Sequence, residues 1–453
     1  MTIEFTRESM QTVQQVLAAD SGAPPPRPYL EESTRSLGTD SVSVERFISA
    51  DYQRLEYERM WSRVWQWACN AEDIPNVGDH TVYDIGEKSV LLVRVSPDEI
   101  KAYHNACLHR GRQLRTGPGN SRELRCGFHG WTWNLDGELA RIPCRWDFPQ
   151  VRDEDFGLPE VRCERWSQFV FINFDDDAAP LLEALDVIPE HFKHFPMDDK
   201  YTTGWVEKII PANWKITQEA FLESYHSVVT HPELLEWIGD ANTQYDIWER
   251  SSRLFTLTGV NSPHLGEMDD ADVYAAAAEF FTATAPGSIS TELPEGMTVR
   301  EATAELTRTM MGQALGVDWS DESDSLVMDS AQYHVFPNWC PWSGLAQALQ
   351  YRFRPNGDDP HSCIFEVRVM LPLPPGQPRP PAPVKHVLQP GESWLNAPEL
   401  MGFCAIMEQD EANLVAIQRG LRATTRKGVP YGEYQESRIR LFHQILDEYL
   451  VRP

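Results

Sequence analysis

The sequence predicts an α+β protein in which a small β domain precedes a larger domain of mixed helices and strands. Between residues 78 and 172, short apolar runs such as 89–95 and 169–173 have the length and β-branched composition of strands. Helical spacing of apolar residues dominates much of the chain after residue 176. Further strands are expected near 331–337, 346–354 and 363–371.

Three regions follow one another along the chain. Residues 1–43 hold a proline cluster at 24–28 and few periodic apolar positions, which predicts an extended arm. Residues 44–175 are expected to form the β domain, including a preceding helix over 44–66. Residues 176–453 are expected to form the larger domain.

Three segments of the larger domain have distinctive compositions. Residues 372–390 are dense in proline and are expected to form an exposed connection. Residues 433–450 read as an amphipathic helix that caps the domain. Residues 255–330, with a helix near 299–315, are expected to be an insertion that forms a pocket wall, a lid or a subunit contact.

Composition and charge exclude several classes of function. A formal charge of −28 argues against nucleic acid or an anionic membrane as a partner. No apolar stretch has the length of a membrane span, and the N-terminus lacks a signal pattern, which favours a soluble cytoplasmic protein. Six cysteines are scattered without pairing rhythm and are expected to be free thiols of a reducing compartment: residues 69, 144, 163, 340, 363 and 404.

The first metal-binding pattern interleaves cysteine and histidine. Cys107 and His109 form a Cys-x-His pair, and Cys126 and His129 form a Cys-x-x-His pair. In a Rieske [2Fe–2S] cluster, two cysteines hold one iron and two histidines hold the other. A structural zinc site is the alternative, but zinc patterns usually pair cysteine with cysteine and histidine with histidine. The mixed pairs therefore favour a Rieske cluster.

The second pattern lies about a hundred residues further on. A helix is expected from Trp214 to just before His231, with Glu219, Glu223 and His226 on one face. The proline after His231 ends this helix, so both histidines can approach one metal. One carboxylate, with Glu223 as a local candidate, would complete the 2-His-1-carboxylate triad of non-haem Fe(II) oxygenases. The alternative is two unrelated histidines near a helix end.

Together these segments resemble the Rieske non-haem iron oxygenases, specifically the α (terminal oxygenase) subunits of the aromatic-ring-hydroxylating type. The resemblance implies a small antiparallel β Rieske domain and a helix-grip catalytic domain, in which helices pack on an antiparallel sheet. The segments that carry it are 107–111, 126–131, 136–139, 213–232, 408–410 and 418–421.

The resemblance also implies a role for each site residue. It assigns Cys107, His109, Cys126 and His129 to the [2Fe–2S] cluster. It assigns His226, His231 and Asp410 to a mononuclear iron, with Glu411 as the fallback for Asp410. Glu223 becomes the bridge for electron transfer between subunits, where naphthalene-type members have aspartate. This glutamate is similar to that of homotrimeric members, including those that oxidise quaternary ammonium compounds.

The implied activity is O2-dependent hydroxylation of an aromatic or bulky hydrophobic substrate, either as monohydroxylation or as cis-dihydroxylation. Electrons would come from NAD(P)H through a reductase, with or without a ferredoxin, to a homotrimer or an α3β3 assembly. Oxidative demethylation or cleavage of a quaternary ammonium compound is one alternative. A Rieske electron-transfer protein without oxygenase activity is another. Candidate pocket residues are Phe221, Leu222, Val335 and Phe336.

A group of arginines stands out between the two cluster-binding pairs. We interpret it as a docking surface for an acidic electron donor or as a partner for acids across a subunit interface. Equally, individual arginines could bind nearby carbonyl groups and helix ends. The group comprises Arg110, Arg112, Arg115, Arg122 and Arg125.

Overall fold

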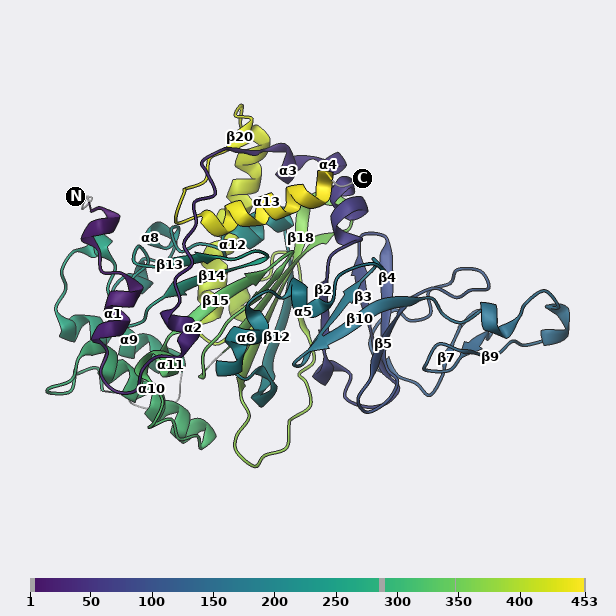
Figure 1. The fold of residues 1–453 in the computed structure, drawn as a ribbon, viewed down its shortest axis with the longest axis horizontal. Helices are drawn as coiled ribbons and strands as arrows, with labels where there is room; N and C mark the ends of the chain where they lie inside the picture. The colour runs from purple at the N-terminus through teal and green to yellow at the C-terminus, as the bar shows by residue number, and fades with distance from the viewer. Residues whose placement is uncertain (1–4, 285–289, 347, 452–453) are drawn as a thin grey trace. The chain divides into compact units, whose positions relative to one another are not determined.

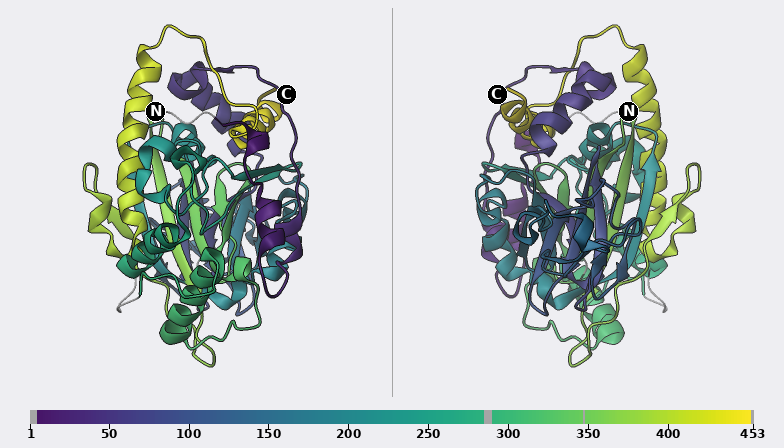
Figure 2. Two further views of the ribbon diagram at one scale, coloured as in Figure 1. Left: turned by 90° about the vertical axis from the view of Figure 1, so that its left-hand side faces the viewer. Right: turned by 90° about the vertical axis from the view of Figure 1, so that its right-hand side faces the viewer.

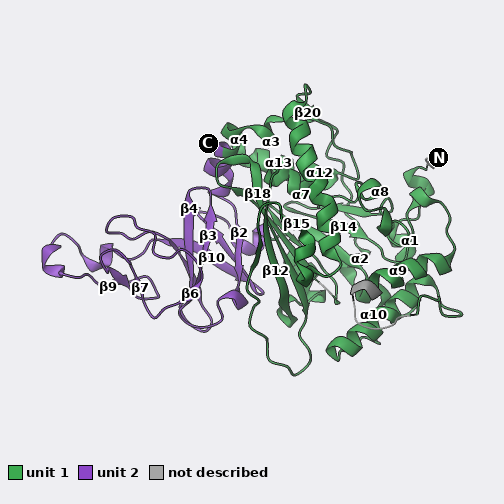
Figure 3. Ribbon diagram, turned by 180° about the vertical axis from the view of Figure 1, so that it is seen from behind, with its two compact units in different colours: residues 1–53, 185–451, 453 green, residues 54–184, 452 purple. Residues whose placement is uncertain are grey.

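The computed structural model describes residues 5–284, 290–346 and 348–451. The chain forms two compact units, one of residues 54–184 and one of residues 1–53 with 185–451 (Figure 3). The boundaries expected from the sequence were residues 44 and 175. Positions 1–4 of the expected arm, 285–289 of the expected insertion and 347 of an expected strand lie outside the described residues.

The smaller unit is built on antiparallel strands, as expected. Its main sheet has seven strands in the order β2-β11-β10-β5-β4-β3-β6, and a second sheet has the order β7-β8-β9. The strands are β2 Gln66–Asn70, β3 Asp79–Ile85, β4 Lys88–Arg94, β5 Ile100–His104, β6 Gly119–Asn120, β7 Leu124–Arg125, β8 Thr132–Trp133, β9 Leu139–Arg141, β10 Glu160–Trp166 and β11 Phe169–Asn173.

The core of the smaller unit lies directly beneath the Cys-His pairs. Leu91, Tyr103, Trp131 and Trp133 are buried there together with both motif cysteines. Large apolar and aromatic side chains stabilise a small domain by removing apolar area from water. The two loops with the motif therefore stand on a packed base.

The larger unit contains an eight-stranded sheet in the order β13-β14-β15-β16-β17-β18-β12-β19. All its neighbouring strands are antiparallel except β12 and β19, which are parallel. The strands are β12 Lys200–Ile210, β13 Gln244–Ile247, β14 Ser251–Thr256, β15 Ser330–Val335, β16 Trp339–Pro341, β17 Ala348–Asn356, β18 Asp359–Pro372 and β19 His386–Leu388. The three strands expected here correspond to β15, β17 and β18.

The strand β19 corrects the expectation that residues 372–390 form only a connection. Val387 of β19 pairs with Glu207 of β12. Residues 384–389 contain no proline. Their backbone N–H groups are therefore available for a strand ladder, which proline would interrupt.

Helices surround the sheet of the larger unit. The long helix α12 runs along one face of the sheet, and α7 packs between α12 and strands β17 and β18 (Figures 1 and 2). The helices of this unit, apart from α4, which continues into the smaller unit, are α1 Val13–Ala19, α2 Arg27–Leu30, α3 Glu45–Ile48, α6 Ile188–His191, α7 Trp214–Glu219, α8 Ser227–Thr230, α9 Asp270–Thr284, α10 Val299–Leu315, α11 Asp324–Met328, α12 Phe403–Ala423 and α13 Ser437–Val451. The elements α4 Ala50–Glu56 and α5 Leu181–Ala184 complete the set of α-helices in the described residues.

The N-terminal segment is more structured than the extended arm expected from its sequence. A capping box between Thr12 and Gln15 starts the helix α1. Further on, the fully buried ring of Tyr29 contacts Phe195 and Phe255. Burial of an aromatic ring therefore packs this segment against the rest of the larger unit. Its proline content alone had predicted an extended arm.

Within the described ranges, no helix is long and apolar enough to cross a membrane.

Candidate metal centre

The segment that carries the two histidines expected to bind iron is not one continuous helix, contrary to expectation. Helix α7 ends at Glu219, and a second short helix begins at Ser227. Between them, Ser224 Oγ donates to Asp240 O at 2.9 Å, and the Ser224 N–H donates to Tyr245 Oη at 3.1 Å. Side-chain bonds of this kind compete with helical backbone bonds. The interruption is therefore built from tertiary contacts that the helical pattern did not reveal.

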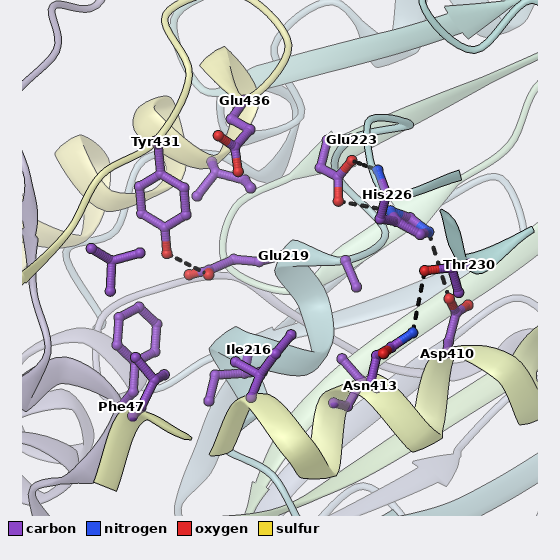
Figure 4. A pocket seen from close by; sticks show the side chains of 16 residues that line it. Phe47, Ile216, Glu219, Glu223, His226, Thr230, Asp410, Asn413, Tyr431 and Glu436 are labelled. Carbon is purple, nitrogen blue, oxygen red and sulfur yellow. Dashed lines mark hydrogen bonds and ion pairs between the residues drawn. The ribbon is translucent and has the colours of Figure 1, made fainter. Parts of the chain in front are cut away.

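The interruption brings His226 and His231 to the same buried carboxylate. His231 Nε2 lies 3.0 Å from Asp410 Oδ1. His226 Nε2 lies 3.5 Å from the same oxygen (Figure 4). One ligand atom from each residue lies within 4.8 Å of the others. His231 has φ −127° and ψ 58°, outside the helical region, as the following proline predicts.

Each imidazole is oriented by an acceptor on its outer nitrogen. His226 Nδ1 lies 2.7 Å from Glu223 Oε1, and His231 Nδ1 lies 2.7 Å from Gln409 Oε1. When Nδ1–H donates to these oxygens, the Nε2 lone pairs face Asp410 and are free to bind a metal. Burial lowers the pKa of His226, but the bond and charge of Glu223 and the charge of Asp410 outweigh it and raise the pKa.

The donor set fits a mononuclear iron. Two imidazole nitrogens and one carboxylate oxygen form the set that non-haem Fe(II) sites use. Asp410 is only 4% exposed, and a carboxylate so deeply buried requires a compensating cation or hydrogen bonds. A bound divalent metal would supply that compensation.

The two alternative carboxylates point elsewhere. Glu411 Oε2 accepts hydrogen bonds from Lys208 Nζ at 2.5 Å and Trp394 Nε1 at 2.6 Å. Successive residues of an α-helix point about 100° apart, so Glu411 and Asp410 cannot share one target. Glu223 directs its carboxylate to the ring and the backbone N–H of His226.

The Cys-His pairs of the smaller unit lie in two loops of matching geometry. The Cys107 N–H donates to Arg112 O at 2.8 Å, and the Cys126 N–H donates to Trp131 O at 2.8 Å. A glycine with positive φ closes each loop, because only glycine adopts this conformation without strain. His109 Nδ1 and His129 Nδ1 lie 3.1 Å apart.

The two thiols have different electrostatic surroundings. Burial raises the pKa of Cys107. Burial also acts on Cys126, but backbone N–H groups of Phe128 and His129 and the thiol of Cys107 overcome it and lower the pKa. Donors aimed at sulfur and two adjacent imidazoles fit a Rieske cluster, in which both cysteines bind as thiolates.

The arginine group divides into a structural member and exposed members. The half-buried Arg115 donates to the carbonyl oxygens of Leu114, Glu123 and Arg125 at 2.8, 3.1 and 3.1 Å. It therefore stabilises the chain between the two cluster loops. For Arg115 this agrees with the alternative that individual arginines bind nearby carbonyl groups. Arg110, Arg112, Arg122 and Arg125 are exposed.

A cavity of about 210 Å³ in the larger unit is lined in part by His226 and Asp410. Helices α7 and α12 supply apolar lining, to which the rings of Phe47 and Tyr431 add (Figure 4). Three carboxylates beyond Asp410 also line it: Glu219, Glu223 and Glu436.

The pocket residues suggested by the sequence do not line this cavity. Phe221 instead packs against Tyr351, Phe353 and Phe365 with ring centroids 5.1, 5.5 and 5.0 Å away. Leu222, Val335 and Phe336 are likewise buried. Helices α9 and α10 of the expected insertion pack on each other around Trp237, and none of their described side chains lines the cavity.

Two family descriptions match the chain and together cover most of it. Residues 189–451 match the catalytic domain of the ring hydroxylating alpha subunit, and residues 64–152 match the Rieske [2Fe-2S] domain. The fold and the donor sets agree with this class of protein. The chain therefore belongs to the family of ring hydroxylating alpha subunits and carries a Rieske domain.

Curated relatives include both aromatic dioxygenases and a carnitine monooxygenase. Biphenyl 2,3-dioxygenase subunit alpha of Rhodococcus jostii (strain RHA1) is 33% identical over 184 residues, 39% of this chain and 40% of that protein. The carnitine monooxygenase oxygenase subunit of Escherichia coli (strain K12) is 31% identical over 186 residues, 39% of this chain and 48% of that protein. The matched segments thus span less than half of these relatives.

Solved structures with the same fold cover nearly the whole chain. The quaternary ammonium Rieske monooxygenase CntA in complex with L-carnitine has a TM-score of 0.64 at 14% identity, over 90% of this chain and 95% of that chain. Naphthalene 1,2-dioxygenase from Rhodococcus sp. bound to indole has a TM-score of 0.60 at 18% identity, over 91% and 94%. The similarity shows a shared fold.

Proposed function

We propose that this chain is the terminal oxygenase component of a Rieske-type oxygenase that hydroxylates an aromatic or bulky hydrophobic substrate with O2. The observation that carries the proposal is the convergence of His226, His231 and Asp410 in a chain that also has paired Cys-His loops. A Rieske protein limited to electron transfer would have no use for this second donor set.

In this proposal each donor set holds one cofactor. Cys107, His109, Cys126 and His129 hold the [2Fe–2S] cluster, and His226, His231 and Asp410 hold the iron. When bound, the cluster supplies one-electron transfer and the iron supplies O2 activation. Glu223 orients His226 through the 2.7 Å contact to Nδ1 and serves as the electron bridge from the neighbouring subunit.

The proposed partners follow from this arrangement. Electrons come from NAD(P)H through a reductase, with or without a ferredoxin, and the subunits form a homotrimer or an α3β3 assembly. Inter-subunit transfer between equivalent sites suits a closed ring. A cytoplasmic location is supported by the six cysteines outside the cluster pairs, none of which forms a disulfide.

Replacement of Asp410 tests the proposal. The loaded protein should contain about three irons per chain, and Asp410→Ala should contain about two, with the visible spectrum of the cluster unchanged and turnover abolished. Glu411→Gln is the matched control, since Glu411 pairs with Lys208, and it should keep all the iron. Full iron content and turnover in Asp410→Ala would contradict the assignment.

A second candidate function is oxidation of a quaternary ammonium compound. It is supported by the lining of the cavity, where Glu223 and Glu436 could offset a positive charge and the rings of Phe47 and Tyr431 could contact it. Oxygen uptake with reductase, measured with biphenyl and with L-carnitine in parallel, separates the two. If only one of the two compounds gives product in proportion to the O2 consumed, that compound identifies the substrate class.

A further inference from the structure

Glu219, Tyr431 and His443 form a hydrogen-bonded group beside the cavity. Glu219 and Tyr431 lie on the far side of the cavity from Asp410 (Figure 4). Tyr431 Oη lies 2.6 Å from Glu219 Oε2, and His443 Nε2 lies 2.8 Å from Glu219 Oε1. Glu219 and Tyr431 line the cavity. His443 is 2% exposed and lies behind them.

The neighbouring arginine determines which nitrogen of His443 carries hydrogen. Arg46 Nη1 lies 3.4 Å from His443 Nδ1, and a guanidinium can only donate. Nδ1 is therefore the acceptor, and Nε2–H donates to Glu219 Oε1. Burial, Arg46 and Lys215 lower the pKa of His443 well below its ordinary value. His443 is thus a neutral, fixed donor that cannot take a proton from Glu219.

This arrangement defines where Glu219 can carry a proton. Burial raises the pKa of Glu219 to about 8, although Tyr431, Lys215 and Arg46 each act to lower it. In the structure the Tyr431 hydroxyl donates to Glu219 Oε2, and His443 Nε2–H donates to Oε1. When Glu219 takes up a proton, that proton sits on Oε2, and Oε2–H then donates to Tyr431 Oη. The Tyr431 hydroxyl hydrogen is then free to point into the cavity.

Other charged groups act on the same cavity. The pKa of Glu436 is raised chiefly by burial. The negative charges of Glu223 and Glu219 raise this pKa further. The hydroxyl of Tyr431 stays protonated, because burial and the charge of Glu219 raise its pKa well above the ordinary value. A cavity surrounded by carboxylates therefore favours proton entry and disfavours a tyrosinate.

We propose that Glu219 and Tyr431 form a proton reservoir that delivers one proton to the cavity beside Glu223 and His226 in each turnover. The Oε2–H bond of Glu219 breaks as Tyr431 Oη takes this proton and releases its own hydroxyl proton into the cavity. The remaining carboxylate is stabilised by the His443 Nε2–H. No electron moves in this step, and solvent in the cavity restores the proton.

This proposal rests on the proposed function, because incorporation of O2 into a substrate with two added electrons also consumes two protons. Glu219 and Tyr431 belong to the chain itself and can be examined apart from turnover. The proton on Glu219 is therefore testable by spectroscopy, and its delivery is testable by kinetics.

Infrared difference spectroscopy of the full, cofactor-loaded chain tests the protonation. Between about pH 6 and about pH 10, a protonated-carboxyl band should disappear with a midpoint at about pH 8. The band should be missing in Glu219→Gln and present in Tyr431→Phe, which keeps the carboxyl but removes the hydroxyl. A spectrum of Glu219→Gln identical to that of the wild type would overturn the proposal.

Turnover with the substrate found by oxygen uptake tests the delivery. Glu219→Gln and Tyr431→Phe should each lower kcat by about 100-fold, with a small change in KM. Glu433→Gln is the control, since Glu433 is exposed and hydrogen-bonded to Ser36. Unchanged kcat in both variants would overturn the proposal. A wild type that shows the band but oxygenates nothing would instead contradict the proposed function.

Discussion

Gln409 and His231 are joined by a 2.7 Å contact between Oε1 of the amide and Nδ1 of the imidazole. Gln409 immediately precedes Asp410 in helix α12. One turn of this helix therefore supplies both a proposed ligand and the acceptor that orients another ligand. An outer acceptor of this kind fixes the tautomer of a metal-binding histidine.

We expect Gln409→Ala to weaken iron binding by about 10- to 100-fold, because His231 loses the acceptor that fixes its ring. Iron content after dialysis against a ferrous chelator measures the effect. Gln409→Glu keeps an oxygen at this position and should retain iron. Equal retention in the alanine variant and the wild type would show that Gln409 does not support the site.

We expect Glu223→Ala to lower product formation by about 10- to 100-fold, because His226 loses the 2.7 Å contact to its Nδ1 and the electron bridge is removed. Reduction of the cluster by its donor, followed by stopped-flow absorbance, should stay at the wild-type rate. Glu233→Gln, at an exposed position close in sequence, is the control. A slower cluster reduction in Glu223→Ala would place the defect elsewhere.

Charge reversal should separate the two kinds of arginine near the cluster loops. Arg112→Glu with Arg122→Glu should raise the KM for the donor protein by about tenfold at low ionic strength, and salt should reduce the difference. Arg115→Ala should instead lower the free energy of unfolding by about 1–3 kcal/mol, because several carbonyl oxygens lose their donor. A KM for the donor protein that is unchanged by the charge reversal and by salt would contradict the docking interpretation.

The buried His334 should make the larger unit less stable in acid. It is 1% exposed, and burial together with Arg438 lowers its pKa to about 3. The unfolded imidazole binds a proton below its ordinary pKa of 6.5, whereas the folded one stays neutral. Stability should therefore fall between pH 6.5 and 3 by ~1.4 kcal/mol per pH unit from this group.

Urea unfolding at several pH values measures this slope. His334→Gln should reduce it by the contribution of one proton, whereas His194→Gln, at an exposed position, should leave it unchanged. Equal slopes in His334→Gln and the wild type would show that His334 binds its proton in the folded state as well.

Local patterns in the sequence were enough to predict several strands and the types of residue that could bind metal. Apolar and β-branched runs predicted β4, β11, β15, β17 and β18 because side-chain periodicity reflects burial. Cys107, His109, Cys126 and His129 could be paired from spacing, because each pair lies within one tight loop. The interruption between Glu219 and Ser227 could not be predicted, since the bonds that break the helix come from Asp240 and Tyr245.

By itself the sequence determined the class of fold, the cysteine–histidine pairs and the presence of His226 and His231 near one helix end. Only the tertiary structure decided which carboxylate faces them, because Asp410 lies far along the chain and its neighbour Glu411 points to Lys208. It alone brings Gln409 into contact with His231, and Glu219 into contact with Tyr431 and His443. Such contacts depend on how helices pack across a sheet, which local periodicity does not encode.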